Sequence, residues 1–129
     1  MEIPVPTAPA ELIDKITILE IKADRIGDAR KRANVRAELS LLHQARDAAI
    51  APSDWLARLT AALRAVNEEL WEIEDKIREC ERRGDFGLVF VELARAVYRT
   101  NDRRAAIKRE INTRLDSNIV EEKAYAAYS

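Results

Sequence analysis

The feature that most constrains the fold of this chain is how few helix-breaking residues its 129 positions contain. The glycines are Gly27, Gly84 and Gly87, and the prolines lie at positions 4, 6, 9 and 52. Between these breaks, apolar residues recur every three or four positions, which is the period of an amphipathic helix and not of a strand. So few turn signals also leave little room for a many-stranded sheet. We therefore expect an all-α fold.

The breaks and the residues beside them predict four helices, at about 9–26, 29–49, 54–83 and 86–114. Pro9 suits a first helical turn, Ser53 and Asp54 can cap the third helix, and Gly84 can end it. The tail from Asp116 onward is expected to hold a turn at 116–118 and a short last helix.

Short connections make consecutive helices antiparallel neighbours, so the chain is expected to form a single domain, 1–129, built as an antiparallel helical bundle. The third and fourth helices would form a long hairpin of roughly 45 Å, at about 1.5 Å per residue. The first two helices can cover only part of that length. The Gly84 end is then less covered and open to a partner or a second copy.

Composition narrows the functional classes. The net charge is −1, which gives no general attraction to nucleic acid or acidic lipid. The longest apolar runs fall far short of the roughly 20 residues of a membrane span, and the N-terminus lacks the pattern of a signal peptide. A single Cys80 and a single His43 argue against His/Cys metal sites, and no Glu-x-x-His pair is present for a di-iron bundle. We expect a cytoplasmic protein without metal, cofactor, nucleic-acid partner or membrane partner.

A stripe of polar residues interrupts the apolar face of the fourth helix. In its first half this face consists of Phe86, Phe90, Leu93 and Val97. In its second half the same face carries polar side chains spaced 3, 4 and 4 positions apart: Asn101, Arg104, Lys108 and Asn112. Buried cations are costly unless they are paired, so this stripe requires partners.

The first helix offers the candidate partners. Glu20 falls within its apolar face and would lie opposite the gap between Arg104 and Lys108 if the outer ends of the two helices were level. Asp14 would then be level with Asn112. Residues 99–114 carry six cations against two anions, a local charge of +4. The arrangement predicts a charged pocket for a small anionic metabolite, with or without catalysis.

Two other interpretations stay open. One is a structural oligomerisation module whose buried polar network sets helix register, and a dimer that buries Trp71 or Ile18 and Ile21 would support it. The other is a lyase or mutase that acts by electrostatics alone, because ELIDKITILEIKADRI (11–26) is similar to the first helix of helical chorismate mutases. Glu68, Glu69 and Glu72 match the EExxE magnesium motif, but the required second motif overlaps it, so a solvated face is the better interpretation.

A resemblance covers nearly the whole chain. The blocks ELIDKITILEIK (11–22), NVRAEL (34–39), LWEIEDKIR (70–78), LARAVYRTNDRRAAIKREIN (93–112) and EEKAY (121–125) resemble a family of short bacterial and phage helical proteins known only as a domain of unknown function. The resemblance implies no activity. An association of such relatives with surface-polysaccharide genes would point to a phosphosugar or sugar nucleotide as ligand. Combined with the polar stripe, it leads us to expect these ligand-binding residues: Asp14, Lys15, Glu20, Asn101, Arg104, Lys108, Asn112 and Tyr125.

Overall fold

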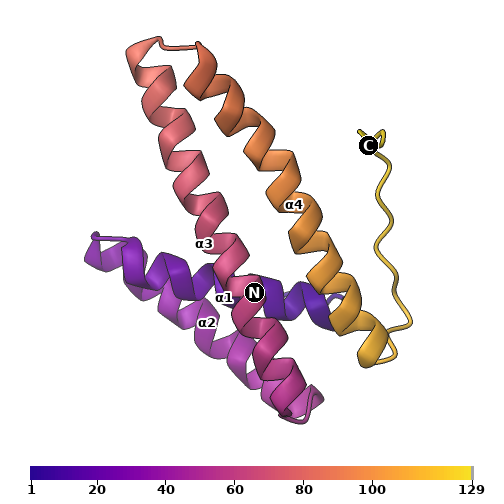
Figure 1. The fold of residues 1–129 in the computed structure, drawn as a ribbon. Coiled ribbons are helices and arrows are strands. Elements are labelled where there is room, and N and C mark those ends of the chain that lie inside the picture. The colour runs from indigo at the N-terminus through magenta and orange to yellow at the C-terminus, as the bar shows by residue number, and fades with distance from the viewer. Residues whose placement is uncertain (129) are drawn as a thin grey trace.

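The computed structural model describes residues 1–128 and contains four α-helices within them (Figure 1). Their bounds are α1 Pro9–Arg25, α2 Ala29–Ala49, α3 Asp54–Arg83 and α4 Leu88–Arg114. No strand occurs in this part of the chain, so the expected all-α fold is confirmed. The expected bounds agree with these, except that α1 ends one residue earlier and α4 begins two residues later than the sequence predicts.

The ends of the helices follow from local chemistry. The side chain of Asp28 accepts a hydrogen bond from the backbone N–H of Lys31 at 2.9 Å and caps α2. Ser53 Oγ accepts one from the backbone N–H of Leu56 at 3.3 Å and caps α3. Gly84 ends α3 with a left-handed backbone (φ 66°), a conformation that glycine adopts without the steric cost of a Cβ atom.

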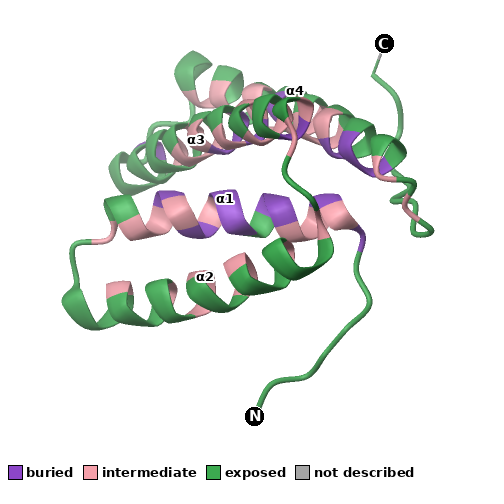
Figure 2. Ribbon diagram, turned by 90° about the horizontal axis from the view of Figure 1, so that it is seen from below, coloured by how far each residue is buried: buried purple, intermediate pink, exposed green. Residues whose placement is uncertain are grey.

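The four helices form two antiparallel hairpins that cross each other, and α1 is the helix at the centre of the crossing (Figures 1 and 2). It contacts α2, α3 and α4, whereas α2 packs along α1 alone among the other three helices. This position explains the burial pattern, because α1 buries seven of its 17 residues and α2 buries none. The α1–α2 hairpin thus depends on α1 for its attachment to the rest of the molecule.

The apolar core lies where α1 meets the open end of the α3–α4 hairpin. Its buried members are Ala10 and Ile13 from α1, Leu56 and Leu63 from α3, and Ile111 from α4. Burying each of the isoleucine and leucine side chains among them stabilises the fold by about 1.5–3 kcal/mol. This core holds the first turns of α1 against the last turns of α4.

The far part of the long hairpin extends beyond α1 and α2 (Figure 1), and we take it as residues 79–97, beyond the α3 residues that share a groove with α1. We call it the hairpin extension. Within it only Cys80 is buried. The expectation that the Gly84 end is less covered is confirmed.

The tail differs from the expectation. The turn after α4 is present, with Asp116 at φ 52°, but residues 119–128 form no helix, so the predicted short last helix is wrong for the described residues. Ser129 lies outside them. Residues 119–128 are exposed, and a helix this short gains too little without a buried apolar face. No helix among the described residues is long and apolar enough to span a membrane.

Candidate functional site

The polar stripe of α4 meets α1 around the carboxylate of Asp14. This side chain is only 5% exposed. It accepts hydrogen bonds from Asn67 Nδ2 on α3 at 2.8 Å and from Arg104 on α4, through Nε at 3.1 Å and through Nη2. One carboxylate therefore receives donors from two other helices.

Lys108 lies one turn further along α4 and its side chain is only 8% exposed. Its ammonium group lies 2.6 Å from Glu11 Oε1, 3.1 Å from Glu121 Oε2 and 4.0 Å from Asp14 Oδ2. Burial by itself would lower the pKa of Lys108, but hydrogen bonds to Glu11 and Glu121 and the charge of Asp14 outweigh it, and the pKa is raised. Lys108 therefore remains a cation inside the protein.

We refer to Asp14, Arg104, Lys108, Glu11 and Glu121 as the Asp14 cluster. The hydrogen bonds to Asp14 also raise the pKa of Arg104. Two cations face three carboxylates, so the cluster carries a formal charge of −1. The local excess of cations along α4 is thus neutralised by α1 and by the tail.

Neutral polar groups complete the junction. Thr17 Oγ1 donates to the backbone oxygen of Asp14 at 2.8 Å and accepts a hydrogen bond from Asn67 Nδ2 at 2.9 Å. Asn112 Oδ1 accepts the backbone N–H of Ala10 at 2.9 Å, in the first turn of α1. In the described part of the chain, no buried side-chain nitrogen or oxygen lacks a hydrogen-bond partner. The polar groups of these buried side chains therefore find their hydrogen-bond partners within the protein.

The expected contact of Glu20 with Arg104 or Lys108 is wrong. Glu20 pairs instead with Arg64 on α3, with 2.9 Å between Glu20 Oε2 and Arg64 Nη1, and Asp24 lies 2.8 Å from the same guanidinium. The reason is the crossing of the hairpins. The first turns of α1 meet α4, but its later turns pass over α3 and away from α4 (Figure 1).

Three further expected ligand residues lie outside the Asp14 cluster. Lys15 faces α2, where its ammonium lies 2.9 Å from Glu38 Oε2 and both side chains are largely exposed. Asn101 and Tyr125 line a separate pocket of about 810 Å³ between α4 and the tail, and Tyr125 is 90% exposed. The structure therefore brings together Asp14, Arg104 and Lys108, with Asn112 beside them, and separates the others.

Glu11, Thr17, Asn67 and Glu121 are residues of this site that the sequence analysis did not select as ligand residues. The sequence spacing of Glu11 and Asp14 did indicate that they could pair with Arg104 and Lys108. Glu11 and Asp14 are three positions apart and Arg104 and Lys108 are four apart, so each pair shares one face of its helix. Glu20 and Asp24 are also four positions apart, so the spacing alone does not choose between these two pairs of acids.

The tail supplies the outer side of the site. Residues 119–128, which we call the strap, run back along α4 (Figure 1) and are held there by ion pairs. Besides Glu121 with Lys108, Glu122 lies 3.7 Å from Arg109, and Lys123 pairs with Asp102. A pocket of about 590 Å³ lies between the strap and the end of α4, with Arg109 and Lys123 among its lining residues.

A second hollow lies on the other side of Arg104. We call it the α1–α3 groove; its volume is about 400 Å³, and its lining includes Ile18, Ile21, Leu70 and Trp71. Ile21 is buried within the chain, whereas Ile18 and Trp71 remain half-buried. The groove opens where the hairpin extension leaves α1.

Comparison with known protein families gives a match over nearly the whole chain. A family model described as a family of unknown function, DUF6165, matches residues 3–128. No curated protein and no solved structure matches the chain.

Proposed function

We propose that this chain, which belongs to the family of unknown function DUF6165, is a helical assembly module. In this proposal, two copies of the chain associate through their hairpin extensions. The observation that carries the proposal is the exposed apolar surface at the far end of the hairpin. Phe86, Leu88, Val89 and Val91 are 54%, 86%, 62% and 46% exposed, and they lie within six consecutive positions. We call these four residues the tip cluster.

A helix pair with an apolar surface needs a further layer to bury it. Stable helical domains pack such faces against other helices, and exposed apolar clusters commonly mark interaction sites. In the part of the chain that the structure describes, α1 supplies this layer, and only for the other end of α3 and α4. A second helix pair on the hairpin extension would complete a four-helix arrangement.

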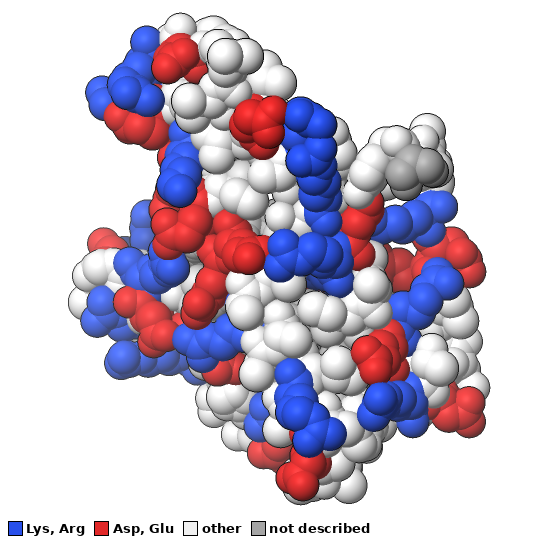
Figure 3. All heavy atoms as spheres, viewed as in Figure 1, with Lys and Arg blue, Asp and Glu red and all other residues white. Residues whose placement is uncertain are grey.

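The charges of the hairpin extension favour a second copy as the partner. Between positions 79 and 97 the chain has three cations and four anions, so its net charge there is −1. Figure 3 shows both signs interspersed on the face that it presents. Such a surface neither attracts a strongly charged partner nor repels an identical one, and two-fold dimers are the commonest symmetric assembly.

The Asp14 cluster has a supporting role in this proposal. Buried polar networks can fix how helices pack, because every misaligned arrangement leaves a charge or a donor unpaired. Here the network ties α1 to α3 and α4 near the open end of the long hairpin. It thereby keeps α1 and α2 clear of the hairpin extension, which stays available for assembly.

The test is the oligomeric state of the full chain, measured by sedimentation equilibrium and by light scattering across a wide range of protein concentrations. We expect a reversible monomer–dimer equilibrium for the wild type and a monomer for the variant Leu88→Glu/Val89→Glu. Both side chains are mostly exposed, so circular dichroism should show the same helix content. Leu41→Glu, at a position 47% exposed on α2, is the control and should dimerise like the wild type. A wild type that stays monomeric throughout would overturn the proposal.

A second candidate function is supported by the contact of Glu121 with Lys108. The strap has no helical structure, and its Glu121 carboxylate contacts the Lys108 ammonium. Lys108 is otherwise enclosed by α1 and α4. A phosphate or carboxylate of a metabolite, including the phosphosugar or sugar nucleotide suggested by the resemblance, could replace the Glu121 carboxylate. The electrostatic lyase or mutase has less support, because Arg104 and Lys108 are both paired with the chain's own carboxylates.

Thermal unfolding in inorganic phosphate, at constant ionic strength, tests this second candidate. The variant Glu121→Gln removes the competing charge and should be stabilised by phosphate more than the wild type, since a ligand that binds the folded state raises its stability. Glu122→Gln is the matched control, because its partner Arg109 is largely exposed. The anion site is excluded if phosphate raises the melting temperature of all three proteins equally or of none.

A further inference from the structure

The three tyrosines of the chain line one pocket, which lies between α4 and the strap and has a volume of about 810 Å³. We call it the tyrosine pocket. Tyr98 comes from α4, and Tyr125 and Tyr128 come from the strap, which runs back along α4 (Figure 1). These residues are 42%, 90% and 59% exposed, so their rings remain accessible in the folded chain. Accessible ring faces in a pocket are suited to stacking against a flat ligand.

Two of the rings are held in place by each other and by α4. The ring centroids of Tyr98 and Tyr128 lie 5.0 Å apart, and the interplanar angle is 57°. The Tyr128 hydroxyl is also hydrogen-bonded to the Asp102 carboxylate, which raises the pKa of Tyr128 and keeps the phenol neutral. A ligand that stacks on these rings meets side chains whose positions are already fixed, so less ordering is required when it binds.

The charges of the tyrosine pocket favour an uncharged ligand. Its two charged lining residues are Lys123 and Asp102, and they pair with each other. Besides the tyrosines, the neutral lining residues are Val97, Asn101, Ala126 and Ala127. A site of aromatic and small apolar side chains with few polar groups suits a heterocyclic base, because every base has a π-face that stacks on aromatic rings.

Asn101 adds a hydrogen-bonding preference. It belongs to the polar stripe of α4, but it takes no part in the Asp14 cluster and lines the tyrosine pocket instead. Its side-chain amide carries a donor and an acceptor side by side, which is the pattern complementary to the N6 amino group and N7 of adenine. We infer that the tyrosine pocket binds the adenine base of a small metabolite, stacked on the tyrosines and hydrogen-bonded to Asn101. The inference goes beyond the assembly function, because the pocket lies within a single copy.

Nitrogen-15 NMR of the full chain, titrated with adenosine, tests this inference, because adenosine carries the base without an anionic group. We expect shifts of the backbone amides in 97–102 and 123–128 and of the side-chain amide of Asn101. Asn101→Ala and Tyr125→Ala should each bind adenosine about fivefold more weakly, since the first loses the paired hydrogen bonds and the second loses a stacking ring. Inosine has an oxygen in place of the N6 amino group and should also bind the wild type about fivefold more weakly.

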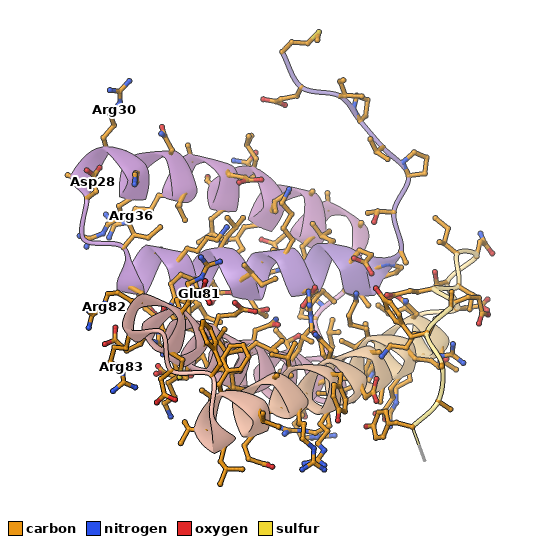
Figure 4. All side chains as sticks on the ribbon, turned by 90° about the horizontal axis from the view of Figure 1, so that it is seen from above. Asp28, Arg30, Arg36, Glu81, Arg82 and Arg83 are labelled. Atoms are coloured by element: carbon orange, nitrogen blue, oxygen red, sulfur yellow. The ribbon has the colours of Figure 1, made fainter. Side chains whose placement is uncertain are left out.

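Two matched controls should bind adenosine like the wild type. Tyr125→Phe keeps the aromatic ring, and Asn34→Ala removes an exposed amide from α2. Asn34 lies about one turn after Arg30, on the opposite side of the molecule from the strap (Figures 1 and 4). Circular dichroism should show the same helix content for all four variants, so that a change in affinity reports on the pocket and not on folding.

Weaker binding by Asn101→Ala, by Tyr125→Ala and of inosine, with both controls unchanged, supports the adenine pocket. Shifts confined to another part of the chain overturn it, as does equal affinity for adenosine and inosine. Unchanged binding by Tyr125→Ala and a lack of any shift at millimolar adenosine count against it equally. A chain that binds methyl β-D-glucoside more tightly than adenosine also overturns it, because that ring is uncharged but not aromatic. The assembly function is tested by oligomeric state, so it stands or falls independently of these results.

Discussion

The carboxylate of Asp14 accepts two hydrogen bonds from the guanidinium of Arg104, at Nε and at Nη2, and this pair joins α1 to α4 across 90 positions of the chain. A guanidinium that binds a carboxylate in this bidentate way constrains orientation as well as distance. Asn67 adds a donor from α3 to the same carboxylate at 2.8 Å. One side chain of α1 therefore fixes where this helix crosses both members of the long hairpin.

Removing the charge of Asp14 should destabilise the protein strongly. We expect Asp14→Asn to lower the free energy of unfolding by about 3 kcal/mol, because it leaves a partly buried guanidinium and the Lys108 ammonium with fewer partners. The measurement is urea denaturation followed by circular dichroism. Glu20→Gln is the control and should cost only about 0.5 kcal/mol, since the pair of Glu20 with Arg64 is partly solvated. Equal costs for the two variants would contradict the central role of Asp14.

Replacing the pair by apolar side chains should be tolerated far better than breaking it. Asp14→Leu/Arg104→Met removes both charges and fills a similar volume, which is often neutral or stabilising for a buried ion pair. We expect a folded protein with a melting temperature near that of the wild type and clearly above that of Asp14→Asn. Calorimetry of the three proteins provides the comparison. A double variant less stable than the single one would mean that the polar junction is required for folding itself.

Acid should release the strap before it unfolds the helices. The hydrogen bond from Lys108 lowers the pKa of Glu121, and the hydrogen bond from Lys123 lowers that of Asp102. A carboxylate whose pKa is depressed in the folded state stabilises that state above its unfolded pKa, about 4 for these groups, and the stabilisation is lost as the pH falls through the depressed value. Amide exchange in residues 119–128 should therefore rise relative to the helices below about pH 4. Unchanged relative protection at low pH would show that these ion pairs do not hold the strap.

The turn of the long hairpin requires glycine at position 84. Its backbone is left-handed at φ 66°, so Gly84→Ala should destabilise the protein by about 1 kcal/mol, although no atom lies within 4 Å of an added Cβ. Gly27→Ala is the control. Gly27 does not have a positive φ, and a Cβ added there would also have no atom within 4 Å. It should be neutral or slightly stabilising through the unfolded chain. Thermal melts of the two variants test this difference.

Local signals in the sequence determined the helices. The cap residues Asp28 and Ser53 and the break at Gly84 act within one turn of the chain, so their effects do not depend on the tertiary fold. The polar stripe containing Arg104 and Lys108 was likewise predictable, because a fixed helical period shows which positions share a face. The need for a carboxylate partner followed from the cost of burying a cation.

Only the tertiary structure decided which carboxylate that partner is. Asp14 and Glu20 are both on inward faces of α1, and the choice between them depends on the angle at which the two hairpins cross, which no local signal sets. In the crossed arrangement Glu20 meets Arg64, and Asp14 meets Arg104. The strap was unpredictable for the same reason: its conformation follows from distant partners such as Lys108, and not from the helical propensity of its own residues. Helical period and capping are properties of neighbours in sequence, whereas ion-pair partners are chosen by the packing of whole elements.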